Sequence, residues 1–194
     1  MKPLFYLIFF VGIIVGCKSS SNSLSKETIS QKVSVLLESK HFNIECSQMY
    51  PTNTSLLQAI ANAGLIAPGN SVGQINITGS NNYFKIVGDS ISVNLPFYGE
   101  QQLGGLAYNR NNVGFSFQGI PKEFSESKNV KKNIRILNYT FPNGAESCKA
   151  QIRIYSQGSA EINITSSHRS SIRYRGNIKS ISNDLRILAN ATHK

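Results

Sequence analysis

The spacing of apolar residues changes once along the chain, from a helical period to a strand period. Apolar side chains in Ile29–Leu37 recur at helical spacing, which predicts one short amphipathic helix over about Ser25–Lys40, with Ser25 as its N-cap. Beyond this helix, apolar and polar residues alternate, as in Phe42–Cys46 and Ile91–Leu95. A period of two indicates strands that bury one face.

Turn residues separate the strand patterns at the spacing of antiparallel hairpins. Gly88-Asp89 lies between two alternating runs, and Gln157-Gly158 lies between two more. Short strands joined by tight turns are typical of antiparallel barrels and sandwiches. We therefore predict a mainly β fold, an antiparallel barrel or sandwich preceded by one N-terminal amphipathic helix.

Two stretches do not follow the alternation. Residues 55–71, SLLQAIANAGLIAPGNS, fit either a helical turn that ends at Gly64 or an irregular insertion, and the sequence does not choose between them. Between Ile134 and Phe141 the apolar positions switch from one face to the other. That switch predicts a β-bulge near Ile136.

The first residues have the composition of an export signal. Lys2 precedes the apolar run Leu4–Val15, and the small residue Gly16 precedes Cys17. A bilayer core of about 30 Å requires roughly 20 residues of helix, so this run is too short to span it. We expect a cleaved leader rather than a transmembrane helix.

Ile14–Cys17 resembles a bacterial lipobox, at which lipid is attached to a cysteine thiol and the leader is cut off before it. The resemblance implies that residues 1–16 are a lipoprotein signal peptide and that residues 17–24 are the lipidated Cys17 and a flexible tether. Residues 25–194 would then form a single helix-plus-barrel domain, lipid-anchored in the bacterial cell envelope. The expected site is the outer membrane, facing the periplasm or the surface. The alternative is an ordinary signal peptide that leaves Cys17 free.

Two further cysteines, Cys46 and Cys148, share the parity of the apolar residues in their strand patterns, so both thiols should point inward. An oxidising compartment favours pairing, and we predict a disulfide between them. The alternative is two buried free thiols. Alternation does not show that the two Cα atoms lie within about 7 Å of each other, as a disulfide requires.

Few residues of this chain are suited to catalysis. It has three histidines, and it contains no zinc, P-loop or dinucleotide motif. We therefore predict no catalytic residues, no metal and no cofactor. His168, within TSSHRSS, is the candidate for a hydrolase of unrecognised type, but neither aspartate lies near it in sequence.

Positive charge is concentrated in the last third of the chain. Residues 128–194 carry twelve Lys and Arg against three Asp and Glu, whereas residues 17–127 carry seven of each. Lys128, Lys131 and Lys132 lead into the last group of strand patterns. The basic excess therefore belongs to the C-terminal strands.

Four of these basic residues fall on two predicted strand faces. Lys149 and Arg153 share one face, and Arg173 and Arg175 share another. If the strands are neighbours, the side chains form a basic stripe that could bind anionic lipid headgroups, lipopolysaccharide or an acidic glycan. The alternative is a solvated face, and nucleic acid is not expected for an exported, anchored protein.

Three stretches carry a family resemblance: VLLESKHFNIECSQMYP, YFKIVGDSISVNLPFYGE and GSAEINITSSHRSSIRYRGNI. In this order they resemble the domain-of-unknown-function family 4251, small lipoproteins of Gram-negative bacteria. The match runs from about Val35 to Ile178, and the longer insertion around Leu56–Ser71 departs from it. The resemblance implies a lipocalin-like, mostly antiparallel β-barrel behind an N-terminal helix. It implies no established activity and supplies no catalytic residues.

The sequence as a whole predicts a non-enzymatic envelope lipoprotein that acts as a binding or interaction module. Its partners would be the membrane, through the anchor, and an anionic envelope glycan, lipid or protein. A carrier of a small apolar ligand inside the barrel is the alternative, followed by the hydrolase. Bulky inward positions such as Ile152 and Phe115 favour an interior filled by side chains.

Overall fold

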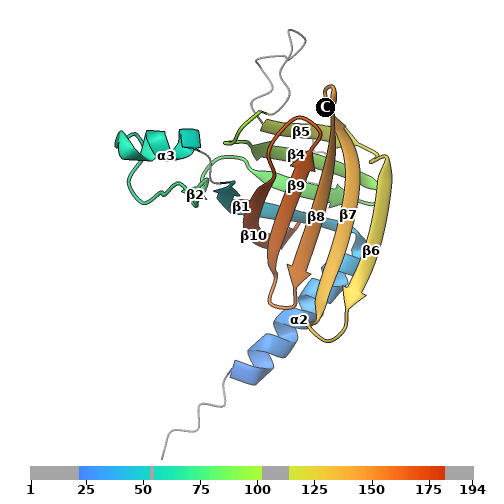
Figure 1. Ribbon diagram of the computed structural model, residues 1–194. Coiled ribbons are helices and arrows are strands. Elements are labelled where there is room, and N and C mark those ends of the chain that lie inside the picture. The colour runs from blue at the N-terminus through green and yellow to red at the C-terminus, as the bar shows by residue number, and fades with distance from the viewer. Residues whose placement is uncertain (1–21, 53–54, 102–113, 182–194) are drawn as a thin grey trace, which may run out of the picture.

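The computed structural model describes residues 22–52, 55–101 and 114–181, so the predicted leader and Cys17 lie outside the described residues (Figure 1). The elements are α2 (Asn22–Ser39), β1 (His41–Pro51), α3 (Ser55–Asn62), β2 (Ile75–Asn76), β3 (Tyr83–Val87), β4 (Ser90–Pro96), β5 (Gly114–Gly119), β6 (Glu123–Asn129), β7 (Ile134–Asn143), β8 (Glu146–Tyr155), β9 (Ser159–Ser166) and β10 (Ile172–Ser180). The predicted mainly β fold behind an N-terminal helix is confirmed.

Helix α2 starts earlier than the apolar spacing predicts and ends where it predicts. It begins at Asn22, so residues 22–24 belong to the helix rather than to the tether. Lys40 follows it with a left-handed backbone, φ 49°, and the Lys40 amide donates to the Leu37 carbonyl at 3.3 Å. Val33 is buried against the turn between β8 and β9.

The strands form one curled antiparallel sheet in the order β5-β4-β3-β1-β10-β9-β8-β7-β6, with β2 attached to β1. Its concave inner face holds the buried side chains, and its convex outer face is mostly polar. The edge strands β5 and β6 are not paired with each other, so the sheet is a half-barrel rather than a barrel closed by hydrogen bonds. Figure 1 shows this curl, with α3 standing away from the body of the sheet.

The predicted hairpin turns are confirmed. Val87 pairs with Ser90, which leaves Gly88 and Asp89 as a two-residue turn between β3 and β4. Gly88 has φ 60°, a conformation that glycine adopts without steric cost. Gly158, with φ 88°, closes the turn between β8 and β9 in the same way.

The predicted bulge near Ile136 is wrong. Strand β7 pairs with β8 without interruption, and Ile136 lies opposite Arg153 on the outer face. The apolar residue at that position is half-buried on the outer surface and needs no change of register. The sheet has a register shift elsewhere, between Cys46 and Gln48 of β1.

The segment that the sequence left open contains both of the structures considered for it. Residues Ser55–Asn62 form helix α3, which ends shortly before Gly64. The rest of the insertion is irregular, apart from an isolated bridge between Ser71 and Gln74.

Large side chains fill the inner face in the described part of the chain. Phe84 of β3 packs against two rings of β7, with centroids 5.5 Å from Tyr139 and 6.3 Å from Phe141. Phe117 of β5 stacks on Phe141 at 5.4 Å. These contacts join the two halves of the curled sheet through side chains, where no hydrogen-bonded ladder joins them.

Candidate functional site

A buried ion pair between Glu146 and Arg169 lies at one end of the half-barrel. Glu146 begins β8, and Arg169 lies in the loop between β9 and β10. The Arg169 Nε and Nη2 atoms lie 2.9 and 2.8 Å from Glu146 Oε1, and both side chains are only 2% exposed. Ser166 Oγ donates to the other carboxylate oxygen at 2.6 Å. The carboxylate is therefore held by protein donors on both of its oxygens.

The same arginine links the edge strand β5, which is paired with β4, to the opposite side of the half-barrel. Arg169 Nη1 donates to the Gly114 carbonyl at 3.2 Å, and its guanidinium lies 5.3 Å from the centroid of the Phe115 ring. Asn143, at the end of β7, also donates to Gly114 O and accepts from the Ser116 amide at 3.0 Å. We call Glu146, Arg169 and Asn143 the closing cluster, because their side chains link β5 to β7 and β8, with which β5 has no backbone ladder.

Sequence reasoning missed the closing cluster although one signal for it was present. Glu146 has the same parity as Cys148 and Ala150, so alternation already placed a carboxylate on the inner face. A carboxylate is almost never fully buried without a partner, so an inward cation had to exist. Its partner Arg169 lies in a loop, where alternation gives no direction for the side chain.

His168 is not brought together with a described carboxylate. Its Nδ1 atom lies 2.7 Å from Ser167 Oγ, the hydroxyl of the residue before it. The nearby Glu146 is already occupied by Arg169 and Ser166. Within the described ranges, no group of three or more His, Cys, Asp and Glu could hold a metal ion.

The prediction of a disulfide is wrong for this structure, in which Cys46 and Cys148 are buried free thiols. Parity placed both side chains inward correctly, but parity does not give position along a strand. Across the sheet, Cys46 of β1 pairs with Gly176 of β10, Gly176 pairs with Ala160 of β9, and Ala160 pairs with Ile154 of β8. Cys148 therefore lies nearer the start of β8 than the residue aligned with Cys46. Two strands, β10 and β9, also lie between β1 and β8.

Burial raises the pKa of both the Cys46 and the Cys148 thiols to about 12. Because the thiolate is the reactive form, we expect neither thiol to react with Ellman's reagent at pH 8 in the folded chain 18–194, and both to react after unfolding in guanidinium. Failure to titrate two thiols after unfolding would instead show a disulfide.

The same pKa shifts predict how stability depends on pH. An unfolded thiol loses its proton at lower pH than the folded one. The free energy of unfolding should therefore be constant below about pH 9 and should decrease as the pH rises towards 12.

Three of the four predicted basic residues gather on the outer face around Tyr50 and Glu161. Arg175 of β10 pairs across the sheet with Glu161 of β9, which pairs with Arg153 of β8. Arg173, two residues before Arg175, pairs with Tyr50 of β1. We call Tyr50, Arg153, Glu161, Arg173 and Arg175 the Tyr50 cluster. The fourth basic residue, Lys149, lies farther along β8, opposite Thr165.

The contacts within the Tyr50 cluster restrain two of its arginines, Arg173 and Arg175. The guanidinium carbons of Arg173 and Arg175 lie 4.7 and 5.6 Å from the centroid of the Tyr50 ring. Arg175 Nη2 donates to Glu161 Oε1 at 2.8 Å, and this bond holds the pKa of the Glu161 carboxyl below its usual range. Arg175 nevertheless stays half exposed, with 52% of its side chain accessible. The cluster presents cationic donors to solvent on a fixed aromatic support.

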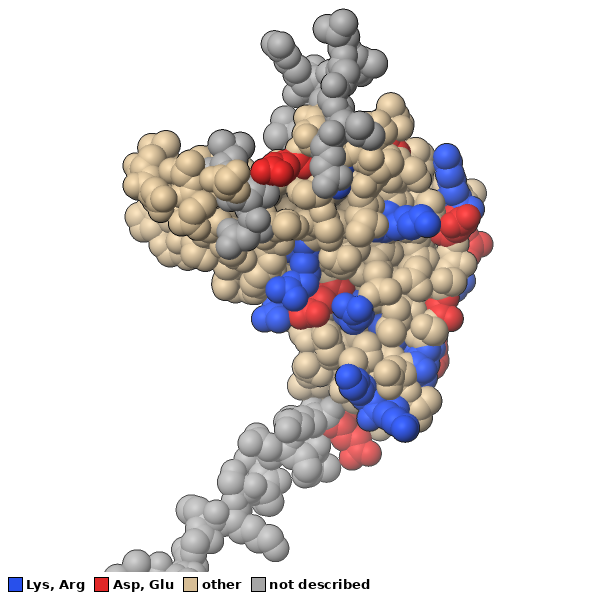
Figure 2. Space-filling model, viewed as in Figure 1, with Lys and Arg blue, Asp and Glu red and all other residues tan. Residues whose placement is uncertain are grey.

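The outer face is mixed rather than uniformly basic. Figure 2 shows Lys and Arg scattered over this face with Asp and Glu among them. Within the Tyr50 cluster, three arginines surround one glutamate. The predicted stripe is therefore a compact cationic cluster with Lys149 lying apart from it.

Comparison with known proteins identifies the family. The family model described as Domain of unknown function (DUF4251) matches residues 25–178. The chain belongs to the DUF4251 family. It is similar to the crystal structure of a DUF4251 family protein from Bacteroides eggerthii DSM 20697, with a TM-score of 0.53 and 11% sequence identity, over 80% of this chain and 90% of that one. No curated protein matches the chain.

Membership in the DUF4251 family confirms the resemblance seen in the sequence and supports the fold, but it assigns no activity. At 11% identity, the solved structure supports the architecture alone. Among the described residues, no helix is both long and apolar enough to cross a bilayer.

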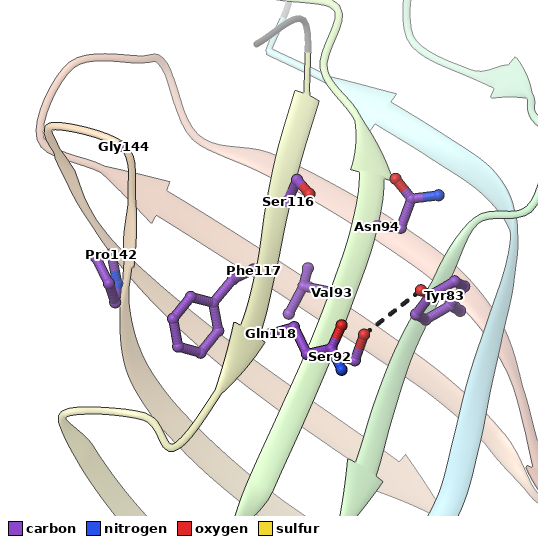
Figure 3. A pocket seen from close by; sticks show the side chains of 9 residues that line it. All are labelled: Tyr83, Ser92, Val93, Asn94, Ser116, Phe117, Gln118, Pro142 and Gly144. Atoms are coloured by element: carbon purple, nitrogen blue, oxygen red, sulfur yellow. Dashed lines mark hydrogen bonds between the residues drawn. The ribbon is translucent and has the colours of Figure 1, made fainter.

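A surface hollow of about 440 Å³ lies beside the edge strand β5. Figure 3 shows Phe117 projecting from β5 towards Pro142, with Ser92 and Asn94 on the neighbouring strand. Its lining side chains are all uncharged, and Tyr83 Oη lies within 3.4 Å of Ser92 Oγ. This hollow therefore lacks the cations that the predicted anionic contact requires.

A second hollow of about 300 Å³ lies beside Lys40, between the turn that joins β3 to β4 and the segment that joins β5 to β6. Phe124 and Tyr139 stack there with centroids 4.9 Å apart. Lys40 Nζ lies 5.4 Å from the Phe124 ring centroid and 3.5 Å from Asp89 Oδ1. Because Asp89 already neutralises this ammonium, the hollow is also a poor match for an anion.

Proposed function

We propose that this DUF4251 protein is a lipid-anchored protein of the bacterial cell envelope that acts as a non-enzymatic binding module. The lipobox-like Ile14–Cys17 supports the anchor. Two acyl chains on one terminus hold a protein stably at a bilayer, whereas a single chain gives marginal, reversible binding. The domain would then present its outer face to the envelope.

The Tyr50 cluster is the observation that carries the binding role. Arginine offers a planar fork of donors that matches carboxylates and phosphates, and Tyr and Arg are enriched where proteins bind partners. Contacts with Tyr50 and Glu161 already restrain Arg173 and Arg175. A ligand would therefore lose less free energy in ordering these side chains than in ordering free arginines.

We infer an acidic glycan as the ligand class. Side-chain amides adjoin the cationic cluster on the outer face: Asn163 lies opposite Arg173, and Gln151 lies opposite Asn163. An amide both donates and accepts hydrogen bonds, which suits sugar hydroxyls, while arginines suit sugar carboxylates. This combination favours a polyhydroxyl chain with acidic groups over an anionic ligand without hydroxyls.

The two alternative functions have less support from the described residues. A carrier of an apolar ligand needs an internal cavity, but aromatic side chains of β3, β5 and β7 occupy the inner face. A hydrolase would need a base oriented by an acid, and His168 contacts a serine instead.

Polygalacturonate, a uronic acid polymer, is the probe for this proposal. We expect the chain 18–194 to bind it, and we expect Arg173→Gln with Arg175→Gln to weaken the Kd by about tenfold or more, because hydrogen bonds to charged groups contribute about 1.5–3 kcal/mol each. The measurement is isothermal titration calorimetry at fixed salt.

Lys149→Gln with Lys122→Gln is the matched control, since it removes the same charge outside the Tyr50 cluster. It should change the Kd by less than about threefold, because exposed charges at a distance are screened by salt. Equal weakening by both double variants would show non-specific attraction and contradict the proposal, as would binding to neutral dextran of equal strength.

A further inference from the structure

The turn between β6 and β7 carries an exposed valine among three lysines. The sequence KNVKK, Lys128 to Lys132, comprises the last two residues of β6 and the first three of this turn, and Val130 at its centre is 79% exposed. All three lysines are exposed as well. The Lys132 amide donates to Asn129 Oδ1 at 3.1 Å, and the Asn133 amide donates to Val130 O at 3.3 Å. The tip is therefore an ordered turn that presents its apolar side chain to solvent.

Several other cations of the described residues have an anion beside them, and these lysines do not. In the described part of the chain, Lys40 pairs with Asp89, Arg135 with Glu126, Arg169 with Glu146, Arg175 with Glu161 and Lys179 with Glu45. None of the described contacts gives Lys128, Lys131 or Lys132 an ion pair. Their charge is thus available to an external anion.

The tip lies at the same end of the sheet as the helix that leads to the N terminus. Ile134, next to the tip, pairs with Tyr155, and the turn after Tyr155 packs on Val33 of α2. Figure 1 shows the turn between β6 and β7 at the end of the sheet where α2 lies. Cys17 precedes Asn22 by five residues, which span at most about 18 Å. An anchor at Cys17 would therefore hold this end of the domain near the membrane.

We propose that the KNVKK tip is a second membrane contact, which docks the domain on a bilayer of anionic lipid. The lysines would lie among phosphate headgroups while Val130 enters the interface, and the domain would stand with its α2 end towards the membrane. This inference rests on the anchor in the proposed function. The positive charge of the tip complements anionic headgroups, and the tip lies at the same end of the molecule as α2. Both features favour a lipid surface over a protein partner.

Vesicle flotation of the chain 18–194 tests this contact without the anchor. All of the described contacts lie within residues 22–181, so this chain keeps every one of them. We expect at least about 30-fold stronger binding to vesicles of phosphatidylcholine with 30% phosphatidylglycerol than to phosphatidylcholine alone, since each lysine near an anionic surface contributes about 1 kcal/mol. For the same reason, Lys128→Gln with Lys131→Gln should reduce the binding about 30-fold.

Lys122→Gln with Lys149→Gln controls for net charge, and Val130→Ser tests insertion. The control should change vesicle binding by less than about threefold, and Val130→Ser should reduce it severalfold. Equal binding to both kinds of vesicle, or equal losses in the two lysine double variants, would overturn the proposal.

A negative result for the membrane contact of the KNVKK tip can be distinguished from a negative result for the proposed function. The anchor is read from the intact mass of the chain purified from membranes, which must include acyl groups on Cys17. The role of the Tyr50 cluster is read from the affinity for polygalacturonate, which Lys128→Gln with Lys131→Gln should leave within about threefold. Neither readout depends on vesicle binding.

Discussion

Gly176→Ala is expected to destabilise the protein by about 3 kcal/mol or more, or to prevent folding. A Cβ atom at Gly176 of β10 would overlap the Glu45 carbonyl oxygen of β1 and lie 2.7 Å from its carbon and 2.9 Å from Cys46 Cα. Backbone atoms in a paired strand cannot move aside as a flexible side chain can, so the two strands must separate. Urea unfolding followed by circular dichroism measures the change.

Gly73→Ala is the matched control, because a Cβ atom there would meet nothing within 4 Å. We expect its free energy of unfolding to stay within about 0.5 kcal/mol of the wild type. A stable, well-folded Gly176→Ala protein would show that β1 and β10 do not approach as closely as described.

Glu146→Gln is expected to destabilise the protein by about 3 kcal/mol. The substitution keeps the size of the side chain but leaves the charge of Arg169 buried without its counter-ion, and removing one partner of a buried pair costs about 3–5 kcal/mol. Urea midpoints and slopes would be compared with those of the wild type. We also expect the loss to loosen β5, which could be followed by hydrogen exchange at Ser116.

Two further variants isolate the buried charge as the cause. Replacing both partners, Glu146→Leu with Arg169→Met, should recover much of the stability, because an apolar pair leaves no unpaired charge. Lys179→Gln, which breaks an exposed ion pair with Glu45, should cost less than about 1 kcal/mol. If Glu146→Gln were as mild as Lys179→Gln, the closing cluster could not be a main support of β5.

Gly176 and the closing cluster both lie where the curled sheet departs from regular strand pairing. Gly176 allows β1 and β10 to pair near a register shift, and the closing cluster holds β5 where the ladder does not continue. Both features stabilise the curl of the sheet. The Tyr50 cluster and the KNVKK tip lie outside them, so variants of either surface should fold normally.

Much of the fold could be predicted because its causes are local. Strand alternation depends on which neighbouring residues are apolar, and Gly88-Asp89 makes a turn through its own backbone freedom. The bulge near Ile136 was predicted wrongly because a half-buried isoleucine on the outer face looks, in sequence, like a change of face. The helix in residues 55–71 could not be chosen over an irregular loop, since the segment is too short for spacing to decide.

The candidate site could be predicted only in part. Parity placed Arg173 and Arg175 together on one face, but it could not show that Tyr50, more than a hundred residues earlier, would lie against them. Lys149 was grouped with the arginines because it shares a face with Arg153, although it lies elsewhere along the strand. Which residues meet depends on strand order and register, which alternation does not contain.

The class of fold, the inward direction of Cys46 and Cys148, the concentration of positive charge and the family all follow from the amino-acid sequence alone. Each follows from composition or from the order of residues along one strand. The folded arrangement was needed to show that the two thiols stay apart, that Glu146 meets Arg169 and that the lysine-rich tip shares an end with α2. Those facts are contacts between distant segments, and they arise from how the sheet curls and in what order its strands pair.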